Sequence, residues 1–401
     1  MAKNSDFSRS RAGRGSGRGW RAWLAAAVYA AAAAIAAATI PAAVPPKITY
    51  ASATQAASPQ PACSTFGVAT SAVWWHKTAE EVRDGYAMAR SVGACAVRIG
   101  VMWNEIEKSP GHYDWAALDK LTLGARDAGI TPMFMIYASP EWWLNDTRVR
   151  ELAGLSSATP LSVVGSSVVA PAAPEEDLNE KRARIFGDFV AQLAGRYGGQ
   201  VDAYEIWNEP NTPRFWSRPN IDHYVMLLKS AYPRIHEADP GATVVSAGMA
   251  PAPDSPTTIA PQTFIRGLYE RGAQDWFDAL GMHPYTWRDA PDQRHRFRDM
   301  EEVLALMDAF GDTGTSVWVT EFGAPTGGFG GITQAEQADL FRWGIREAEA
   351  HPRIAALYLY SVHDCPAGVT NPESYFGMFT STGQAKVAAS TLRADLATPG
   401  F

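Results

Sequence analysis

The sequence predicts an α/β fold consisting of one (β/α)8 barrel, the TIM barrel, with an enlarged loop after its third strand. From Phe66 onward, eight short apolar segments alternate with eight longer segments of helical periodicity, and such alternation requires a parallel sheet. Eight such units in roughly 340 residues also match the size of this barrel. An open, doubly wound sheet is the alternative, but no Gly-x-Gly-x-x-Gly pattern follows the first strand.

The eight strands are expected where short apolar runs stand between turn-forming residues. In chain order they are Phe66–Thr70, Cys95–Met102, Thr131–Tyr137, Val201–Trp207, Thr243–Ala247, Phe277–Met282, Val317–Thr320 and Ile354–Tyr360.

The helices are expected from apolar stripes and capping signals. Thr78-Ala79-Glu80-Glu81 and Thr333-Gln334-Ala335-Glu336 each match a capping box, and Asp114 is expected to cap the second helix. The helices are predicted from Thr78 to Val92, from Asp114 to Gly129, at Leu178–Tyr197, Ile221–Ala238, Pro261–Arg271 and Met300–Phe310, from Thr333 to Ala350, and at Gln384–Leu396.

Residues 1–44 are expected to be an export signal outside this fold. Six Lys and Arg residues precede an Ala-rich apolar run from Trp23 to about Ile40, a pattern typical of secretion signals. The run is long for a cleaved signal, so an uncleaved signal anchor attached to a membrane is the alternative. Residues 45–61, rich in Ala, Pro and Ser, are predicted to be a linker, and residues 62–401 the folded domain. The protein is therefore expected to be secreted or held at the cell surface.

Net charge and cysteine count limit the partners and the compartment. The leader carries +5, so the rest of the chain carries −12 of the total of −7, and this acidic body offers no basic patch for nucleic acid. In an oxidising compartment, three cysteines favour one disulfide and one free thiol. Cys63 and Cys95 precede or begin two neighbouring strands, so we expect these two to pair and Cys365 to be free. Three unpaired thiols are the alternative.

The largest predicted loop, Ser139–Glu176, follows the third strand. Its second half, Gly154–Pro174, is rich in Ala, Ser, Val and Pro and lacks helical periodicity. It is either a wall of a substrate cleft or an insertion without catalytic meaning.

Polar and aromatic side chains follow the strands at their carboxyl ends, where such barrels collect their functional groups. The fourth strand ends in Asn208 and Glu209, and the seventh in Glu321. Other candidates at strand ends are Arg98, Trp103, His283, Tyr285 and His363. Strands four and seven lie across the barrel mouth from each other, so their two glutamates can face one ligand. A close carboxylate pair separates its two pKa values into an acid and a base or nucleophile, as glycosidic hydrolysis requires.

The end of the fourth strand must be irregular if both of its polar residues serve one ligand. Asn208 and Glu209 are adjacent, and an ideal strand would direct them to opposite faces. We therefore expect a bend or bulge near Pro210. Glu205 has the same strand parity as Glu209 but lies deeper, so a structural role is expected for it.

These strand ends resemble those of glycoside hydrolase clan A, and most of all its cellulase-like family 5 and family 39. Trp207-Asn208-Glu209-Pro210 and Thr320-Glu321-Phe322-Gly323 carry the resemblance. It extends to Ala96-Val97-Arg98, Gly111-His112-Tyr113-Asp114-Trp115, Ser139-Pro140-Glu141-Trp142-Trp143 and His283-Pro284-Tyr285.

The resemblance implies a retaining glycosidase that hydrolyses O-glycosyl compounds without a cofactor and has a carbohydrate as its partner. Glu209 would be the acid/base and Glu321 the nucleophile, while Asn208 would bind the sugar hydroxyl beside the reacting carbon. Arg98 and Tyr285 would hold Glu321 ionised, and His283 would line the cleft.

Tryptophans independently favour a glycan cleft, because flat aromatic faces stack on the C–H faces of sugars. Eight of the twelve beyond the leader fall at or just after strand ends: Trp74, Trp75, Trp103, Trp142, Trp143, Trp207, Trp216 and Trp287. We expect Trp103, Trp142, Trp207, Trp287 and also His363 to bind substrate. Clan members often end the eighth strand in tryptophan, whereas this chain has Tyr360 and Val362 there, so the sugar itself is not predicted.

Two other functions use the same scaffold. A transglycosylase would share these residues and transfer the sugar to another sugar instead of water, and a non-catalytic glycan-binding barrel would keep only the cleft. No His, Cys or carboxylate spacing indicates a metal site. The oligomeric state is not predicted.

Overall fold

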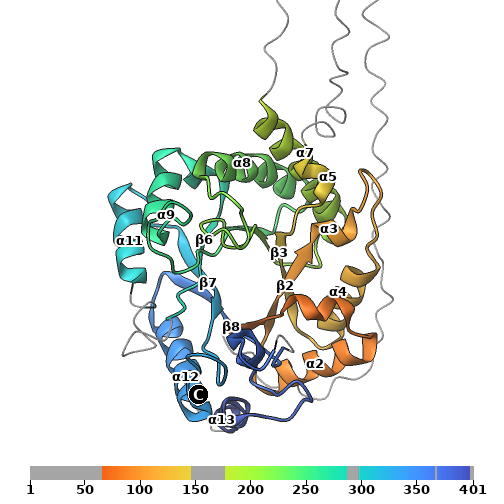
Figure 1. Ribbon diagram of the computed structural model, residues 1–401, viewed down its shortest axis with the longest axis vertical. Coiled ribbons are helices and arrows are strands. Elements are labelled where there is room, and N and C mark those ends of the chain that lie inside the picture. Colours follow the sequence, from red (N-terminus) through yellow and green to blue (C-terminus); the bar gives the residue numbers. More distant parts are fainter. Residues whose placement is uncertain (1–65, 146–176, 287–296, 298, 366–367, 398–401) are drawn as a thin grey trace, which may run out of the picture. The chain divides into compact units, whose positions relative to one another are not determined.

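The computed structural model describes residues 66–145, 177–286, 297, 299–365 and 368–397, and its centre is a closed barrel of eight parallel strands. The strands follow one another around the barrel in chain order, and the eighth pairs with the first (Figure 1). They are β1 Phe66–Ala69, β2 Ala96–Met102, β3 Thr131–Tyr137, β4 Ala203–Ile206, β5 Thr243–Ser246, β6 Ala279–Met282, β7 Ser316–Phe322 and β8 Ile354–Tyr360. The predicted fold class is confirmed.

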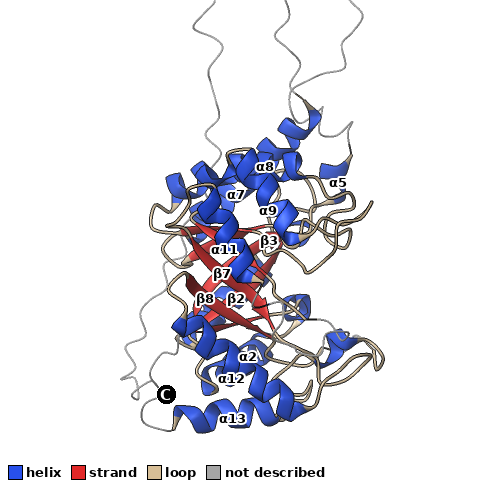
Figure 2. Cartoon of the chain, turned by 90° about the vertical axis from the view of Figure 1, so that its left-hand side faces the viewer, coloured by secondary structure: helices blue, strands red, loops and turns tan. Residues whose placement is uncertain are grey.

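Helices flank the strands, as the side view in Figure 2 shows. The long ones are α2 Ala79–Ser91, α4 Ala116–Asp127, α7 Leu178–Tyr197, α8 Ile221–Ala238, α9 Pro261–Glu270, α11 Met300–Ala309, α12 Gln334–Ala350 and α13 Val387–Leu396. Shorter turns of helix lie in the loops: η1 Ala72–His76, α3 Trp103–Ile106, α5 Glu141–Leu144, η2 Ala273–Trp276 and η3 Pro372–Tyr375.

Local sequence signals placed most of these elements within a few residues. Both capping boxes form. The side chains of Thr78 and Thr333 accept hydrogen bonds from the backbone amides of Glu81 and Glu336, and the side chains of these glutamates accept from the backbone amides of the two threonines. The expectation for Asp114 was wrong by one position, because Trp115 occupies the N-cap of α4 while the Asp114 carboxylate accepts from the Ala116 amide. The strand β4 begins two residues later than expected, and it ends one residue earlier because Trp207 bends into the site described below.

The barrel interior changes from apolar to polar toward the carboxyl ends of the strands. An inner apolar cluster contains Met133, Ala203, Val245, Ala279 and Tyr358, and Ala96 and Trp318 pack against it. Arg98, Glu205 and Thr320 are buried as well, and each lies two residues closer to the carboxyl end of its strand (β2, β4 or β7) than the residue of that strand in or against the apolar cluster. Polar groups at this depth are stable only if they are paired with one another.

Several expectations fall outside the described residues. They are the export signal at 1–44, the linker at 45–61, most of the loop Ser139–Glu176, Trp287, and Cys63 with its predicted disulfide to Cys95, and all of these stay predictions. Cys365, the predicted spare thiol, is a free cysteine. No helix within the described ranges is both long and apolar enough to cross a membrane.

Candidate active site

The end of β4 is bent so that two adjacent residues face one cavity. Trp207 and Glu209 have φ angles of 75° and 42°, a region that non-glycine residues rarely occupy and that costs about 1–3 kcal/mol for each. The Glu209 amide donates to the Gly248 carbonyl (3.1 Å), and the Trp207 indole donates to the Phe215 carbonyl (3.1 Å). Asn208 and Glu209 consequently line the same cavity, which confirms the predicted irregularity.

Glu321, on β7, is held by two donors. Arg98 donates from Nη1 to Oε1 (2.5 Å), and the Tyr285 hydroxyl donates to Oε2 (2.7 Å). Burial alone would raise the pKa of Glu321, but the charges of His283 and Arg98 and the hydrogen bonds from Tyr285 and Arg98 outweigh it, so the pKa is lowered. Glu321 is therefore an ionised carboxylate at the cavity wall, as a nucleophile must be.

Arg98 connects this carboxylate with the interior of the barrel. Its Nε donates to Glu205 (2.5 Å), and its Nη2 donates to Oδ1 of Asn208 (2.7 Å). Burial lowers the pKa of Arg98, but Glu205 and Glu321 raise it further, so the guanidinium stays charged. Because Arg98 occupies the amide oxygen of Asn208, the NH₂ group of Asn208 is left as the donor for a ligand hydroxyl.

His283, which follows β6, connects the second glutamate to the same network. Its Nδ1 lies 2.9 Å from Oε1 of Glu209, and its Nε2 lies 3.0 Å from the Thr320 hydroxyl. Thr320 donates its single proton to Glu205 (2.8 Å), so Nε2 must carry a hydrogen and donate to Thr320. Burial lowers the pKa of His283, but the charges of Glu321 and Glu209 and the hydrogen bond to Glu209 raise it above its ordinary value.

Glu205 has the structural position that its depth predicts. Its side chain is fully buried, and it accepts from Arg98, from Thr320 and from the Gly248 amide (2.9 Å). It is not among the residues that line the cavity.

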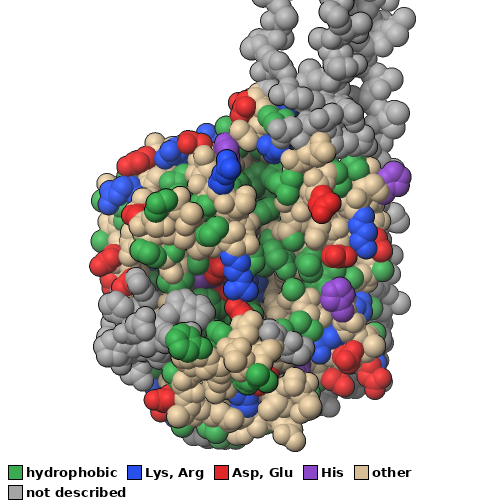
Figure 3. Space-filling model, viewed as in Figure 1, with side chains coloured by type: hydrophobic (Ala, Val, Ile, Leu, Met, Phe, Trp, Pro, Cys, Tyr) green, Lys and Arg blue, Asp and Glu red, His purple; other side chains and the backbone are tan. Residues whose placement is uncertain are grey.

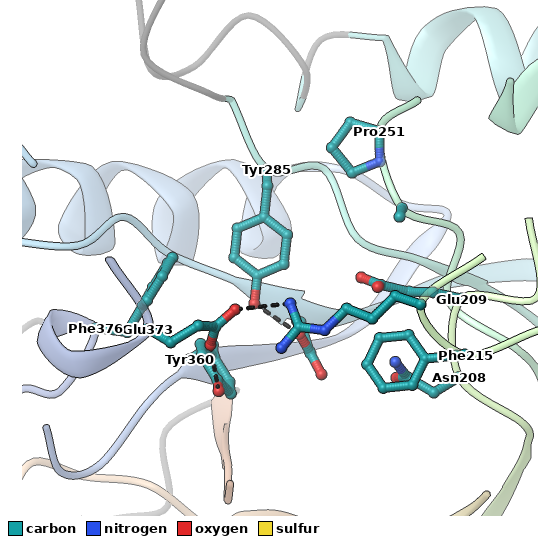
Figure 4. A pocket seen from close by; sticks show the side chains of 11 residues that line it. Asn208, Glu209, Phe215, Pro251, Tyr285, Tyr360, Glu373 and Phe376 are labelled. Carbon is teal, nitrogen blue, oxygen red and sulfur yellow. Dashed lines mark hydrogen bonds and ion pairs between the residues drawn. The ribbon is translucent and has the colours of Figure 1, made fainter. Parts of the chain in front are cut away.

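The cavity between the two glutamates has a volume of about 120 Å³. Figure 4 shows Glu209 and Glu373 at opposite ends of it, with Tyr285 between them. The lining residues are Asn208, Glu209, Arg214, Phe215, Ala250, Pro251, Tyr285, Glu321, Tyr360, Glu373 and Phe376. In the space-filling view, acidic and basic side chains meet near the middle of this face, beside a hydrophobic hollow (Figure 3).

Seven lining residues were not predicted, and six of them are Arg214, Phe215, Ala250, Pro251, Glu373 and Phe376. These six belong to the loops after β4, β5 and β8, several residues beyond the strand ends, where no local pattern distinguishes a lining residue from an ordinary loop residue. Tyr360 could have been found, because it is the last residue of β8.

The two glutamates and His283 converge closely. One donor atom from each of Glu209, His283 and Glu321 lies within 4.8 Å of the other two. The same three groups could therefore hold a cation, which would occupy the carboxylates. The predicted lack of a cofactor stays a prediction.

Four residues expected to bind substrate lie elsewhere. Trp103 is fully buried beneath the rings of Trp142, Trp143, Phe186 and Phe189. Trp142 donates its indole hydrogen to the Glu107 carbonyl (2.9 Å), and Trp207 supports the cavity wall through its bond to Phe215. His363 packs against Trp74 with ring centres 5.6 Å apart. Burial and the charge of Lys77 lower the pKa of His363 to about 4.

These positions have a common physical cause. A large aromatic side chain that follows a barrel strand can turn outward under the surrounding helices as well as inward to the mouth, and sequence does not distinguish the two. Trp207 and Trp143 line a second cavity of about 340 Å³ with Trp216, on the other side of the Arg214–Phe215 segment that borders both cavities. The structure brings Asn208, Glu209, Tyr285 and Glu321 into the first cavity, with Arg98 and His283 directly behind them.

No protein-family model matches the chain, and no curated protein matches its sequence. Solved structures of glycosidases share its fold. A family 39 glycoside hydrolase from Bacteroides cellulosilyticus WH2 has a TM-score of 0.59 at 19% identity over 82% of this chain and 62% of that one. A monomeric β-xylosidase from Caulobacter crescentus CB15 has a TM-score of 0.58 at 15% identity over 85% of this chain and 70% of that one.

A family 5, subfamily 18 enzyme from Bifidobacterium longum, in complex with Manβ1-4GlcNAc, has a TM-score of 0.58 at 13% identity, over 83% of this chain and 78% of that one. This chain spans less than two thirds of the family 39 structure's length. The similarity at these identities is one of fold, and it confirms the expected resemblance to families 5 and 39 at that level. The chain thus shares its barrel fold with these glycosidases, and Glu209 and Glu321 face one cavity at the mouth of the barrel.

Proposed function

We propose that the protein is a retaining glycoside hydrolase that cleaves O-glycosidic bonds of an oligo- or polysaccharide through a covalent glycosyl-enzyme. The observation that carries this proposal is the close approach of the two carboxylates, one oxygen of each lying within 4.8 Å of the other. Retaining enzymes place these groups about 5–5.5 Å apart, whereas inverting enzymes need about 6.5–9.5 Å to admit a water between them.

In the first step, Oε of Glu321 attacks the anomeric carbon, and the bond from that carbon to the leaving oxygen breaks. Glu209 gives its proton to the leaving oxygen. The bonds from Arg98 and Tyr285 keep Glu321 ionised and oriented, and the Asn208 amide donates to the hydroxyl on the neighbouring carbon. Such positioned donors act where charge develops in the transition state.

In the second step, water attacks the anomeric carbon and gives a proton to the Glu209 carboxylate, and the bond to Glu321 breaks. The sugar leaves with its original configuration, and both glutamates return to their starting states. The hydrogen bond between His283 and Glu209 can persist through both steps, since Nδ1 of His283 can donate to ionised Glu209 and accept from protonated Glu209.

The stereochemistry of the product tests this proposal. A panel of 4-nitrophenyl glycosides first identifies a cleaved sugar, and proton NMR of the early reaction mixture then gives the anomer formed before mutarotation. Retention supports the proposal, and inversion contradicts it. The same spectra separate hydrolysis from transfer, because transfer to a second sugar gives a new glycoside and hydrolysis gives the free sugar.

We also propose that the protein is exported from the cell. The basic residues and Ala-rich run of residues 1–44 support a secreted or surface-held glycosidase, and fractionation of cells expressing the full chain would test it.

A further inference from the structure

An ion pair crosses the mouth of the barrel above the two glutamates. Arg214 belongs to the loop after β4, and its Nη1 lies 3.0 Å from Oε1 of Glu373, which lies in η3 after β8. The Tyr360 hydroxyl donates to the other oxygen of Glu373 (3.2 Å) and so fixes the orientation of that carboxylate. Because β4 and β8 are four places apart in a ring of eight strands, this pair connects opposite sides of the mouth.

The cavity lies on one side of this connection. All of its lining residues come from β4 to β8 or from the loops that follow these strands, and the described parts of β1, β2 and β3 and their loops contribute none. Tyr137, the last residue of β3, instead lies beside the Phe215 ring, with ring centres 6.3 Å apart. The described residues therefore form a pocket over half of the barrel mouth, and among them the ion pair interrupts the groove that a long glycan would need across the whole mouth.

The pocket is also small. Its volume of about 120 Å³ is below the roughly 300–1,000 Å³ that is usual for ligand sites. Phe376, Tyr360 and the two residues of the ion pair line this small volume, which favours a single sugar unit over a longer stretch of glycan.

From this geometry we infer that the pocket binds the terminal sugar at the non-reducing end of its substrate, and that Arg214 and Glu373 select this unit. The inference rests on the proposed function. Glu209 protonates the leaving oxygen, so the leaving group lies at the Glu209 end, and the far edge of the retained sugar meets Glu373 at the opposite end (Figure 4).

The chemistry of the ion pair suits free hydroxyl groups. A guanidinium only donates and a carboxylate only accepts, so together they satisfy both functions of a hydroxyl. The hydroxyls that meet the ion pair are those on the edge of the sugar farthest from the leaving group. In a terminal sugar these hydroxyls are free, whereas in an internal sugar one of them carries the next sugar unit, which would collide with the ion pair. Arg214 is 63% exposed and Glu373 is 23% exposed, and a partly exposed ion pair adds little stability, so a hydroxyl can insert between the partners at low cost. The enzyme accordingly removes sugars one at a time from a chain end.

The order of products from a labelled oligosaccharide tests this inference. A tetrasaccharide of the sugar found with the 4-nitrophenyl panel is labelled at its reducing end with 2-aminobenzamide and digested with the full-length protein. We expect the labelled trisaccharide first and the labelled disaccharide only later, and no soluble dye from a cross-linked polymer of the same sugar. A labelled disaccharide in the earliest samples, or release of dye, would overturn the exo mode while leaving the hydrolase intact. Failure to cleave any glycoside would contradict the proposed function itself, and this inference with it.

Substitutions of Arg214 and Glu373 test whether the ion pair selects the terminal sugar. Arg214→Ala and Glu373→Ala should each lower kcat/KM for the tetrasaccharide by about 10–100-fold, the usual effect of losing a charged hydrogen bond, and should increase the share of labelled disaccharide. Arg218→Ala is the matched control, because Arg218 is an exposed arginine of the same loop that does not line the pocket. Wild-type kcat/KM and product order in both ion-pair variants would refute the assignment, and thermal melting confirms that each variant is folded.

Discussion

His283 and Glu209 share a hydrogen bond of 2.9 Å between the imidazole Nδ1 and the carboxylate Oε1. The other ring nitrogen is fixed by Thr320, which donates to the fully buried Glu205. Because Glu205 also pairs with Arg98, and Arg98 with Glu321, one continuous network joins the two candidate catalytic carboxylates.

The role of Glu209 predicts that the effect of its loss depends on the leaving group. Glu209→Gln cannot donate a proton to the leaving oxygen, so kcat/KM should fall by about 10²–10⁴ for a natural oligosaccharide. With a 2,4-dinitrophenyl glycoside, whose leaving group needs no proton, formation of the glycosyl-enzyme should be nearly unaffected. Equal losses on both substrates would show that Glu209 is not the acid.

Arg98 makes three separate contacts that only a guanidinium can make together. Arg98→Lys keeps the charge but replaces the planar fork with one ammonium group, so we expect kcat to fall by about 100-fold and stability by about 1–3 kcal/mol. Arg98→Met leaves Glu205 and Glu321 without their cation and should cost about 3–5 kcal/mol in the free energy of unfolding. Urea denaturation measures both, and a methionine variant as stable as the wild type would refute this account of the network.

The pKa directions of His283 and Glu321 predict how stability changes with pH. The folded pKa of His283 is raised, so its contribution is complete below about pH 6.5 and is lost as the pH rises through the folded value. The folded pKa of Glu321 is lowered, so its contribution is present above about pH 4.5 and is lost as the pH falls. The free energy of unfolding should therefore be highest between these values.

Substitution of the histidine tests that dependence. His283→Asn should remove most of the decline in unfolding free energy above about pH 6.5, measured by guanidinium titration at several pH values. His112→Asn, a change at an exposed histidine, should keep the decline. If both variants declined as the wild type does, His283 would not be the group responsible.

Gly248 leaves the space that His283 occupies. A Cβ atom at this position would lie 2.1 Å from Nε2 of His283 and 2.6 Å from the Thr320 hydroxyl. Gly248→Ala should therefore displace His283, cost about 1–3 kcal/mol, and reduce kcat. Gly314→Ala, where a Cβ meets no atom within 4 Å, is the control for the substitution itself. An unchanged kcat in Gly248→Ala would mean that the position of His283 does not matter to the reaction.

The sequence was sufficient to predict the barrel fold and the polar residues at the carboxyl ends of β4 and β7. Alternating apolar segments determine the order of strands and helices, and the carboxyl ends of parallel strands necessarily meet, so Asn208, Glu209 and Glu321 could be brought together without a structure. Even the bend after Ile206 followed from strand parity, because two adjacent residues cannot otherwise share a ligand.

The remainder of the site depends on loop paths and on the direction in which side chains turn. Arg214 and Glu373 lie 159 positions apart and meet only because two loops extend toward each other over the mouth. Trp103 and Trp207 follow strands as a sugar platform would, yet both pack among aromatic residues of the surrounding helices. Such outcomes depend on tertiary packing, which a local pattern does not specify.

Covalent trapping shows whether Glu321 is the nucleophile. The full-length protein is incubated with a 2-deoxy-2-fluoro glycoside of the cleaved sugar and a good leaving group, and the intact mass and the labelled peptide are then determined. We expect one added fluoro-sugar, located on Glu321, and no label in Glu321→Gln. A label on Glu209, or turnover of the reagent with no covalent adduct and inverted product, would contradict this expectation.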